Sequence, residues 1–515
     1  MTAHRVQAGL QPDLTRVVAR LFLPGAELQS AQSRASQVVA RVMSLPEDEV
    51  DRLAADLLRD FGGRHHDYQA LLRRNASIVS AHLEKPAELT AARTLLLGAT
   101  FTAEYATEAA GLCNPSAVLG PDQGGLRPGQ VRVALSVRGI GEGHISSIGF
   151  CSAVVGPGTQ WSFEPRLQPV SAADTTPARW RRAHLRAVLA DEGHLDELAE
   201  AALHSLPAEF EGADLERALA KAHRDLLTRT GSAATVDLLR KAVSSSYDAS
   251  FARETDLGQR ILAPSAEEES NGMEDARFTR FTDDDGTTEY RATYTAYDGH
   301  RIAPRLLTSS DLRVFHAYRL AGPAARNKGM ALFPRKVHGR HLALCRSDGE
   351  STSLASSADG YVWDQPVLLR APSEPWEMLQ VGNCGPPIET DQGWLVLTHG
   401  VGPMRVYSIG SLLLDLDDPT RVVGYSRTPL LTPGRDEQDG YVPNVVYSCG
   451  AFLHDDLVWI PYGIDDRRIG VAYAPLSEVL ADMSWTQLIR LRTTSSRSAG
   501  CTSSTPGRRS NWPSG

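Results

Sequence analysis

The chain has 515 residues, of which 42% are hydrophobic and 22% charged, so its composition is that of an ordinary globular protein too long for one small core. Its formal net charge of -9 and the lack of a long Lys/Arg run argue against nucleic acid as a partner. Neither a secretory signal nor an apolar stretch of about 20 residues is visible, so we expect a cytoplasmic protein with no membrane partner.

Six cysteines are scattered singly along the chain, without a CxxC motif or a histidine at ligand spacing. This pattern favours reduced, packed thiols over a disulfide framework or a zinc site. We therefore expect no metal and no cofactor.

The first segment, residues 1–110, is predicted to be an N-terminal helical arm. Ser44 to Glu49 contains a serine suited to a helix N-cap, a proline and acids suited to a first turn, and Val50, Leu53 and Leu57 then repeat at helical spacing. Such an apolar stripe needs a partner surface, so the arm is expected to pack on the main domain or to bridge a homo-oligomer.

Residues 111–490 are predicted to form the main β domain, interrupted by a helical insertion at about 170–250. Val131 to Val137 alternates as a strand does, a polar turn follows, and Ile145 to Val155 returns as a second strand. From Asn271 to about Leu480 the chain reads as strands and turns, and 491–515 is expected to be a disordered tail.

An internal repeat is visible in the β segments. Strand ends with a polar or aromatic residue recur about every 50 to 60 residues once the insertion is set aside, which is typical of propeller repeats. These strand ends are Arg138, Tyr294, Arg346, His399 and Tyr462. The fold class is thus predicted as mainly β, a five-bladed β-propeller, with a two-sheet sandwich as the alternative. Trp363 and Trp394 are assigned to the core.

The stretch from Ser270 to Phe278 places the acid pair Glu274-Asp275 and Arg277 at the mouth of a strand. A hairpin is predicted to follow, with its turn at 283–286 and its second strand from Tyr290 to Tyr297. An acid pair in this position is either a solvated loop or part of a catalytic site. In a propeller the inner strands line a channel, where such side chains would converge.

Several blocks in order resemble glycoside hydrolase family 130. Asn271 to Arg277 is similar to the family's Glu-Asp-Pro-Arg signature, with Ala276 in place of the proline. The later blocks that match in the same order are Gly382 to Thr390, Gly393 to Leu395, His399 to Val401, Leu414 to Pro419, Gly440 to Val446 and Tyr462 to Asp466. The helical arm and the insertion lie outside the resemblance.

The resemblance implies a five-bladed propeller that cleaves β-mannosides with inversion, by phosphorolysis or by hydrolysis. Asp275 falls on the position of the proton donor, whose proton is thought to reach the glycosidic oxygen through the mannose 3-hydroxyl. The loss of the family proline at Ala276 removes a residue that stiffens this loop.

The nucleophile decides between the two activities, because phosphate needs cations whereas water needs a base. The candidate phosphate-site residues, partly from the resemblance, are Arg138, Asn327, Lys328, Arg335 and His399. The family's phosphorylases usually carry a lysine just before the Gly-x-Gly block, where this chain reads Leu379-Gln380. Glu142 and Glu377 are candidate bases, and we therefore take a β-mannosidase as the main hypothesis.

The alternative is a glycoside phosphorylase with inorganic phosphate as co-substrate, and a further alternative is a propeller that binds a glycan or a protein without catalysis. The partner in either enzyme is a mannoside or manno-oligosaccharide. Candidate sugar-binding residues carry hydroxyl-pairing or stacking groups: Asn271, Arg277, Tyr294, Asp298, Asn383, Tyr441, Asn444 and Asp466.

Overall fold

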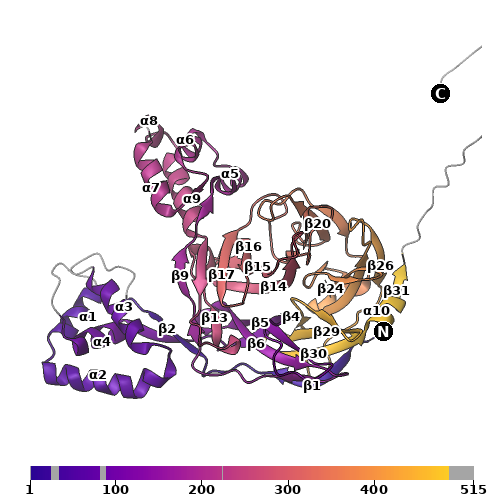
Figure 1. Cartoon of the computed structure of the whole chain (residues 1–515), viewed down its shortest axis with the longest axis horizontal. Helices are drawn as coiled ribbons and strands as arrows, with labels where there is room; N and C mark the ends of the chain where they lie inside the picture. The colour runs from indigo at the N-terminus through magenta and orange to yellow at the C-terminus, as the bar shows by residue number, and fades with distance from the viewer. Residues whose placement is uncertain (1, 25–33, 82–88, 223, 486–515) are drawn as a thin grey trace, which may run out of the picture.

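The computed structural model describes residues 2–24, 34–81, 89–222 and 224–485, so the predicted tail 491–515 lies outside the described residues. The protein is mainly β, as predicted. In Figure 1 the large sheets lie around a common centre, helices α1–α4 form a separate group beside them, and α5–α9 project from another edge.

The largest sheet has twelve strands and contains two runs of long antiparallel strands joined through β6 and β14. A single parallel residue pair, Gly272 with Ser146, makes that junction. Gly272 has a φ of 139°, and a Cβ there would lie 2.8 Å from the Ser146 nitrogen, so only glycine allows this approach. The strands are β4 (Gly111–Leu119), β5 (Val131–Ile140), β6 (Ser146–Val155), β7 (Trp161–Phe163), β8 (Ser171–Ala172), β9 (Asp174–Pro177), β12 (Tyr247–Ser250), β13 (Arg260–Leu262), β14 (Gly272–Thr282), β15 (Thr288–Tyr297), β16 (Ile302–Ser309) and β17 (Val314–Arg319).

Three further sheets complete the β domain. The first has β18 (Ala331–Leu332), β19 (His341–Cys345), β20 (Thr352–Ser357) and β21 (Val367–Arg370). The second has β22 (Gln380–Asn383), β23 (Ile388–Thr390), β24 (Gly393–Val401), β25 (Tyr407–Leu414), β26 (Val422–Ser426) and β31 (Met483–Trp485). The third has β27 (Val446–Tyr447), β28 (Phe452–His454), β29 (Leu457–Ile464), β30 (Arg468–Pro475) and β1 (His4–Leu10), and helix α10 (Leu476–Ala481) follows β30. In the twelve-stranded sheet β5 pairs with β6 and β14 pairs with β15, both antiparallel, which confirms the predicted hairpins at 131–155 and 278–297.

The N-terminal segment differs from the predicted helical arm at both ends. Its first strand, β1, pairs antiparallel with β30, so residues 4–10 belong to the β domain. β2 (Val17–Leu21) pairs with β3 (Thr102–Ala106), and the helices lie between them. These helices are α1 (Arg34–Met43), α2 (Glu47–Phe61), α3 (Tyr68–Ser80) and α4 (Ala91–Thr100). Pro46, not Ser44, is the N-cap of α2.

The helical insertion carries its own apolar core. A two-stranded sheet of β10 (Trp180–Arg181) and β11 (Glu209–Phe210) lies at its base. Its helices are α5 (Arg182–Asp191), α6 (Glu197–Ser205), α7 (Gly212–Lys221), α8 (Arg224–Leu227) and α9 (Ser232–Ser244). β12 returns from α9 and pairs with β17, so the insertion is attached at the outer edge of the sheet that contains β14.

Burial follows the sequence expectations closely. Trp363 and Trp394 are both fully buried, as predicted for core residues. Five of the six cysteines are buried free thiols, and Cys501 lies outside the described residues. No helix in the described ranges is long and apolar enough to cross a membrane.

Candidate active site

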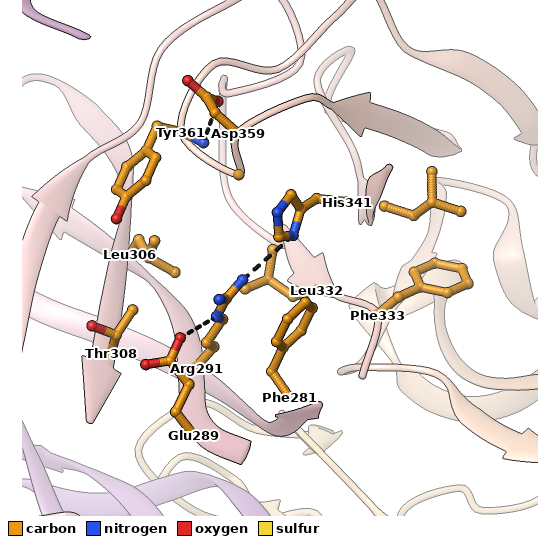
Figure 2. A pocket seen from close by; sticks show the side chains of 12 residues that line it. Phe281, Glu289, Arg291, Leu306, Thr308, Leu332, Phe333, His341, Asp359 and Tyr361 are labelled. Carbon is orange, nitrogen blue, oxygen red and sulfur yellow. Dashed lines mark hydrogen bonds and ion pairs between the residues drawn. The ribbon is translucent and has the colours of Figure 1, made fainter. Parts of the chain in front are cut away.

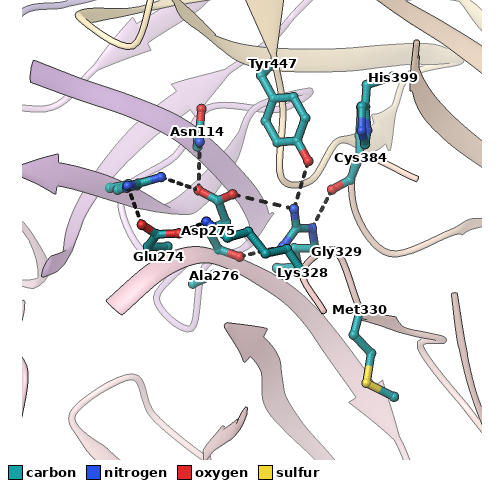
Figure 3. Close-up of polar contacts among 12 residues, drawn as sticks. Asn114, Glu274, Asp275, Ala276, Lys328, Gly329, Met330, Cys384, His399 and Tyr447 are labelled. Carbon is teal, nitrogen blue, oxygen red and sulfur yellow. Dashed lines mark hydrogen bonds and ion pairs between the residues drawn. The ribbon is translucent and has the colours of Figure 1, made fainter. Parts of the chain in front are cut away.

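Asp275 lies at a β-bulge in β14. Pairing with β15 shifts register between Glu274 and Arg277, and Asp275 has a φ of 55°. A non-glycine residue in this region is strained, and such strain is concentrated at functional sites. Asn114 occupies a matching bulge in β4 with a φ of 49°, and its Nδ2 donates to Asp275 Oδ1 at 2.7 Å (Figure 3). The two irregular strands therefore aim their polar side chains at each other.

Cations neutralise the acid pair. Arg138 donates to Glu274 at 2.8 Å and to Asp275 at 3.3 Å, and Lys328 Nζ donates to the other oxygen of Glu274 at 2.5 Å. Burial raises the pKa of Asp275, but Arg138 and Arg277 outweigh it and lower this pKa to about 2. Asp275 is therefore a carboxylate at neutral pH when the site holds no ligand.

Arg277 holds the Asp275 loop in place. Its guanidinium donates to the Asp275 carbonyl at 2.9 Å, to the Cys384 carbonyl at 2.8 Å and to the Tyr447 hydroxyl at 2.9 Å (Figure 3). The side chain is 1% exposed. Arg277 was predicted to bind sugar; in the structure its donors are directed to the Asp275 and Cys384 carbonyls and to Tyr447.

A second polar group, made by His399, Arg346 and Gln380, lies beside the Asp275 cluster. Arg346 Nη1 approaches His399 Nε2 at 2.9 Å, and Gln380 Nε2 lies 3.4 Å from the same atom. A Cβ at Gly382 would lie 2.6 Å from His399 Cε1 and 3.2 Å from Arg346 Cδ, so this glycine lets the two side chains meet. Burial, together with Arg346 and Arg277, holds the pKa of His399 well below its usual range, so the ring is neutral.

Arg346 differs from the other arginines of the site. Among the described residues it has no carboxylate partner, and its buried Nε has no hydrogen-bond partner. A half-buried guanidinium with free donors is suited to an oxyanion. Sequence reasoning noted Arg346 only as a strand end; its spacing of 53 residues from His399, close to the period of the repeat, was the signal that could have indicated their contact.

Asp466 completes the polar cluster. Burial raises its pKa to about 6, although Arg138 acts in the opposite direction. Asn383 is also buried, and its Nδ2 donates to the Gly329 carbonyl at 2.8 Å. Asp466, Asn444 and Asn327 all have positive φ values, as Asp275 does.

The structure places three predicted site residues elsewhere. Tyr294 is 1% exposed and donates to Glu269 at 2.5 Å, so it belongs to the core. Asp298 accepts from the backbone of His300 and Arg301 in the β15–β16 turn. Arg335 pairs with Glu389 at 2.5 Å and stacks on Trp394, so its charge is neutralised outside the Asp275 cluster.

Two further residues predicted to bind sugar, Tyr441 and Asn271, are exposed and contact other side chains or backbone. Tyr441 is 46% exposed, and its hydroxyl lies 2.9 Å from Nδ1 of His144, on which its ring stacks. Asn271 is exposed, and its side chain packs against Gly299: a Cβ at Gly299 would lie 3.0 Å from Asn271 Nδ2.

Neither candidate base is joined to the cluster. Glu377 is 1% exposed and accepts from Arg370 at 2.7 Å and from the backbone of Ser373 and Glu374, so it stabilises its own turn. Glu142 is exposed in the 3₁₀ turn Glu142–His144, and no side chain in the described part of the chain bonds to its carboxylate. Within that same part, no group of three or more His, Cys, Asp or Glu residues is placed to hold a metal ion.

Comparison with known proteins identifies the chain. A family profile described as beta-1,4-mannooligosaccharide phosphorylase matches residues 237–485. A 1,2-beta-oligomannan phosphorylase of Thermoanaerobacter sp. is 34% identical over 230 residues, which cover 43% of this chain and 75% of that protein. A beta-1,4-mannooligosaccharide phosphorylase of Ruminococcus albus is 31% identical over 166 residues, covering 30% of this chain and 50% of that protein.

Among solved structures, a beta-1,2-mannobiose phosphorylase from Listeria innocua in complex with beta-1,2-mannobiose matches with 22% identity and a TM-score of 0.41, covering 72% of this chain and 92% of that chain. The family profile and the Thermoanaerobacter relative show that the protein is a carbohydrate-active enzyme. The extent and identity of the Thermoanaerobacter match show that it belongs to glycoside hydrolase family 130, which confirms the resemblance found in the sequence.

Proposed function

We propose that this enzyme is an inverting phosphorylase of β-mannosides, which transfers a mannosyl group to inorganic phosphate and releases mannose 1-phosphate. The observation that carries the proposal is Arg346, a half-buried guanidinium with no carboxylate partner among the described residues, beside neutral His399. An oxyanion supplies the missing charge and acceptors. The relatives named above are phosphorylases, which supports the same choice.

The β-mannosidase that we favoured from the sequence is not confirmed, and the phosphorylase replaces it. Hydrolysis with inversion needs a base for water. Glu377 stabilises its own turn, and Glu142 is exposed without a partner among the described residues that would orient it. The lysine missing at Leu379-Gln380 is compensated by Arg346, which lies beside Gln380 around the same histidine.

In the proposed reaction a phosphate oxygen forms a bond to the anomeric carbon as the bond to the glycosidic oxygen breaks on the opposite face. Asp275 supplies the proton for the leaving oxygen, through the mannose 3-hydroxyl. Arg138 and Arg277 hold the pKa of Asp275 at about 2, so Asp275 is ionised at neutral pH when no ligand is bound. To act as a proton donor it must first gain a proton, which requires added negative charge nearby. Phosphate bound near Arg346 and Arg138 adds negative charge and so raises this pKa, which couples the two substrates.

We propose that the scaffold is a five-bladed propeller. The twelve-stranded sheet is divided at the single pair Gly272–Ser146 into one group of β4–β7 and another of β14–β17. The three remaining large sheets give three more groups, the last of which is closed by β1. On this reading residues 111–485 are the catalytic domain, the segment 170–250 is an insertion into it, and α1–α4 are an appended helical unit.

The test is product analysis on β-1,2- and β-1,4-mannobiose with and without inorganic phosphate, followed by ³¹P and ¹H NMR. We expect mannose 1-phosphate in the α configuration, formed only with phosphate, from at least one of the two disaccharides. Mannose released at one rate with and without phosphate would refute the phosphorylase. Replacing Glu142 by Gln then serves as a control that leaves phosphorolysis within about twofold, because substitution of an exposed group rarely matters.

A further inference from the structure

Tyr361 lines two hollows, the first within the β domain and the second where the helical insertion meets it. The first, of about 110 Å³, is lined by Arg291 and His341. Its polar groups already pair: Arg291 donates to Glu289 at 2.6 Å and lies 3.4 Å from His341 Nδ1, with its guanidinium over Phe281 (Figure 2). This hollow needs no ligand to satisfy its charges.

The second hollow is different. It has a volume of about 210 Å³ and is lined from the insertion by Trp180, Arg181, His184 and Glu209, and from the β domain by Tyr318 and Tyr361. It thus lies between two parts of the chain, a usual place for a ligand site. Roughly 10–15 Å³ suffices for one water, so the cavity has room for a small molecule.

His184 is a buried polar group without a complete set of partners. It is 8% exposed, and its Nε2 has no hydrogen-bond partner among the described residues. Burial lowers its pKa to about 4, so the ring is neutral and has one donor and one acceptor nitrogen. A buried polar atom without a partner is unfavourable, and a ligand hydroxyl can supply the missing hydrogen bond.

Arg181 supplies the charge. Its guanidinium lies over the Tyr361 ring, 5.5 Å from the centroid, and within the described ranges it forms no ion pair. Arg179, at the same wall, has only a long contact of 3.6 Å with exposed Glu211. Glu209 is the one carboxylate on the described wall of the cavity, so positive charge exceeds negative charge there.

The two tyrosines supply hydroxyls. Burial raises the pKa of Tyr318 to about 12 and raises the pKa of Tyr361, so both phenols stay protonated. Their rings pack edge to face at 5.4 Å, and no hydrogen bond to either hydroxyl is formed by the described residues. Free phenols beside a neutral imidazole suit a ligand rich in hydroxyls.

We propose that this cavity, formed by Trp180, Arg181, His184, Glu209, Tyr318 and Tyr361, is a second ligand site that binds a phosphorylated monosaccharide. The sugar hydroxyls pair with His184, Glu209 and the phenols, and the phosphate pairs with Arg181. The residues that the insertion contributes to the cavity, Trp180 to Glu209, lie before the region that the family profile matches. Whether the phosphate is on carbon 1 or carbon 6 of the sugar is left to the test.

The test is isothermal titration calorimetry of the full chain with mannose 1-phosphate, mannose 6-phosphate, mannose and inorganic phosphate. We expect at least one sugar phosphate to bind at a site that Arg181→Gln weakens by 10-fold or more. Tyr361→Phe, which keeps the ring, should weaken the same site by a smaller factor. Arg217→Gln is the matched control, because Arg217 is an exposed arginine of the insertion that pairs with Asp214 away from the cavity.

Arg346→Gln separates this proposal from the proposed function. We expect it to weaken binding at the Asp275 cluster and to leave the Arg181-dependent site unchanged. The proposal is overturned if Arg181→Gln, folded by circular dichroism, alters no binding, or if mannose alone binds the Arg181-dependent site as tightly as its phosphates. An Arg346→Gln variant with unchanged phosphorolysis would count against the proposed function only.

Discussion

Two buried carboxylates lie six positions apart in this chain and are held in opposite ways. Glu269 is fully buried and accepts from the hydroxyls of Tyr247 and Tyr294 and from the backbone of Ser265 and Ala266. Asp275 is held by arginines and an amide on a strained bulge.

The difference distinguishes a structural acid from the acid that we propose acts in catalysis. The hydrogen bonds to Glu269 come from neutral hydroxyls and backbone N–H groups, and its arginine neighbour, Arg305, lies 3.8 Å away and is itself fully buried. Asp275 and Glu274 are paired with Arg138 and Lys328. Arg346, beside His399, has no carboxylate partner among the described residues, and its Nε forms no hydrogen bond. Burial alone would not distinguish the two carboxylates, whereas the chemistry of their donors does.

Replacing Asp275 by Asn tests the comparison most directly. We expect the rate of β-mannoside cleavage to fall about 100- to 10,000-fold, the range for loss of a general acid, while the protein stays folded. Initial rates and a thermal melt measure this. Asp298→Asn, a turn aspartate, is the matched control and should keep nearly full activity. An Asp275→Asn variant with more than a tenth of wild-type activity would contradict the assigned role.

Replacing Arg346 by Gln should raise the KM for phosphate about 10- to 100-fold, because a charge-assisted hydrogen bond contributes about 1.5–3 kcal/mol. The KM for the mannoside should change much less. Rates measured over a phosphate series report both constants. Arg335→Gln is the control, since Glu389 neutralises Arg335; equal effects of the two variants would place phosphate elsewhere.

Replacing Glu269 by Gln should lower the free energy of unfolding by about 2 kcal/mol, because charge-assisted hydrogen bonds from two tyrosines are lost. Activity at a temperature where the variant is folded should fall less than tenfold. Urea unfolding and initial rates measure the two effects. Glu267→Gln, at an exposed neighbour, should change neither. A rate loss as large as that of Asp275→Asn would remove the distinction between the two acids.

The smallest expected effect is on acid stability. Since the pKa of Asp275 is lowered to about 2, its ionised form stabilises the fold above the usual pKa of 3.8, and this contribution is lost as pH falls towards 2. Asp275→Asn should therefore lose less stability than the wild type between pH 5 and pH 2. Melting temperatures of the wild type and of Asp275→Asn across this range check the sign.

The sequence predicts the fold where local periodicity decides it. The hairpins at 131–155 and 278–297 and the helices of the insertion follow from alternation and helical spacing. The pairing of β1 with β30 does not, because nothing local in His4–Leu10 indicates a partner so far along the chain. The boundary of the arm was therefore set wrongly.

The candidate site likewise has features that the local sequence indicates and features that depend on contacts between distant strands. Asp275 could be proposed from the sequence because its block is contiguous. The structure buries Tyr294 away from the Asp275 cluster, which the sequence does not predict, because alternation separates two faces of a strand without telling which one lines the site. The bulge between Glu274 and Arg277 adds a register shift that period-two alternation cannot reveal. Arg346 was missed since its contact with His399 depends on β19 and β24 meeting in space.

The pairing of β1 with β30 also bears on how the chain is made. Val6 pairs with Val471, so one partner leaves the ribosome long before the other. At about 5–20 residues per second the interval is about 20–90 s. During synthesis the first strand therefore waits with its edge unpaired. Nascent chains stalled before Arg468 should consequently expose this strand to chaperones, and those stalled well beyond Pro475 should not.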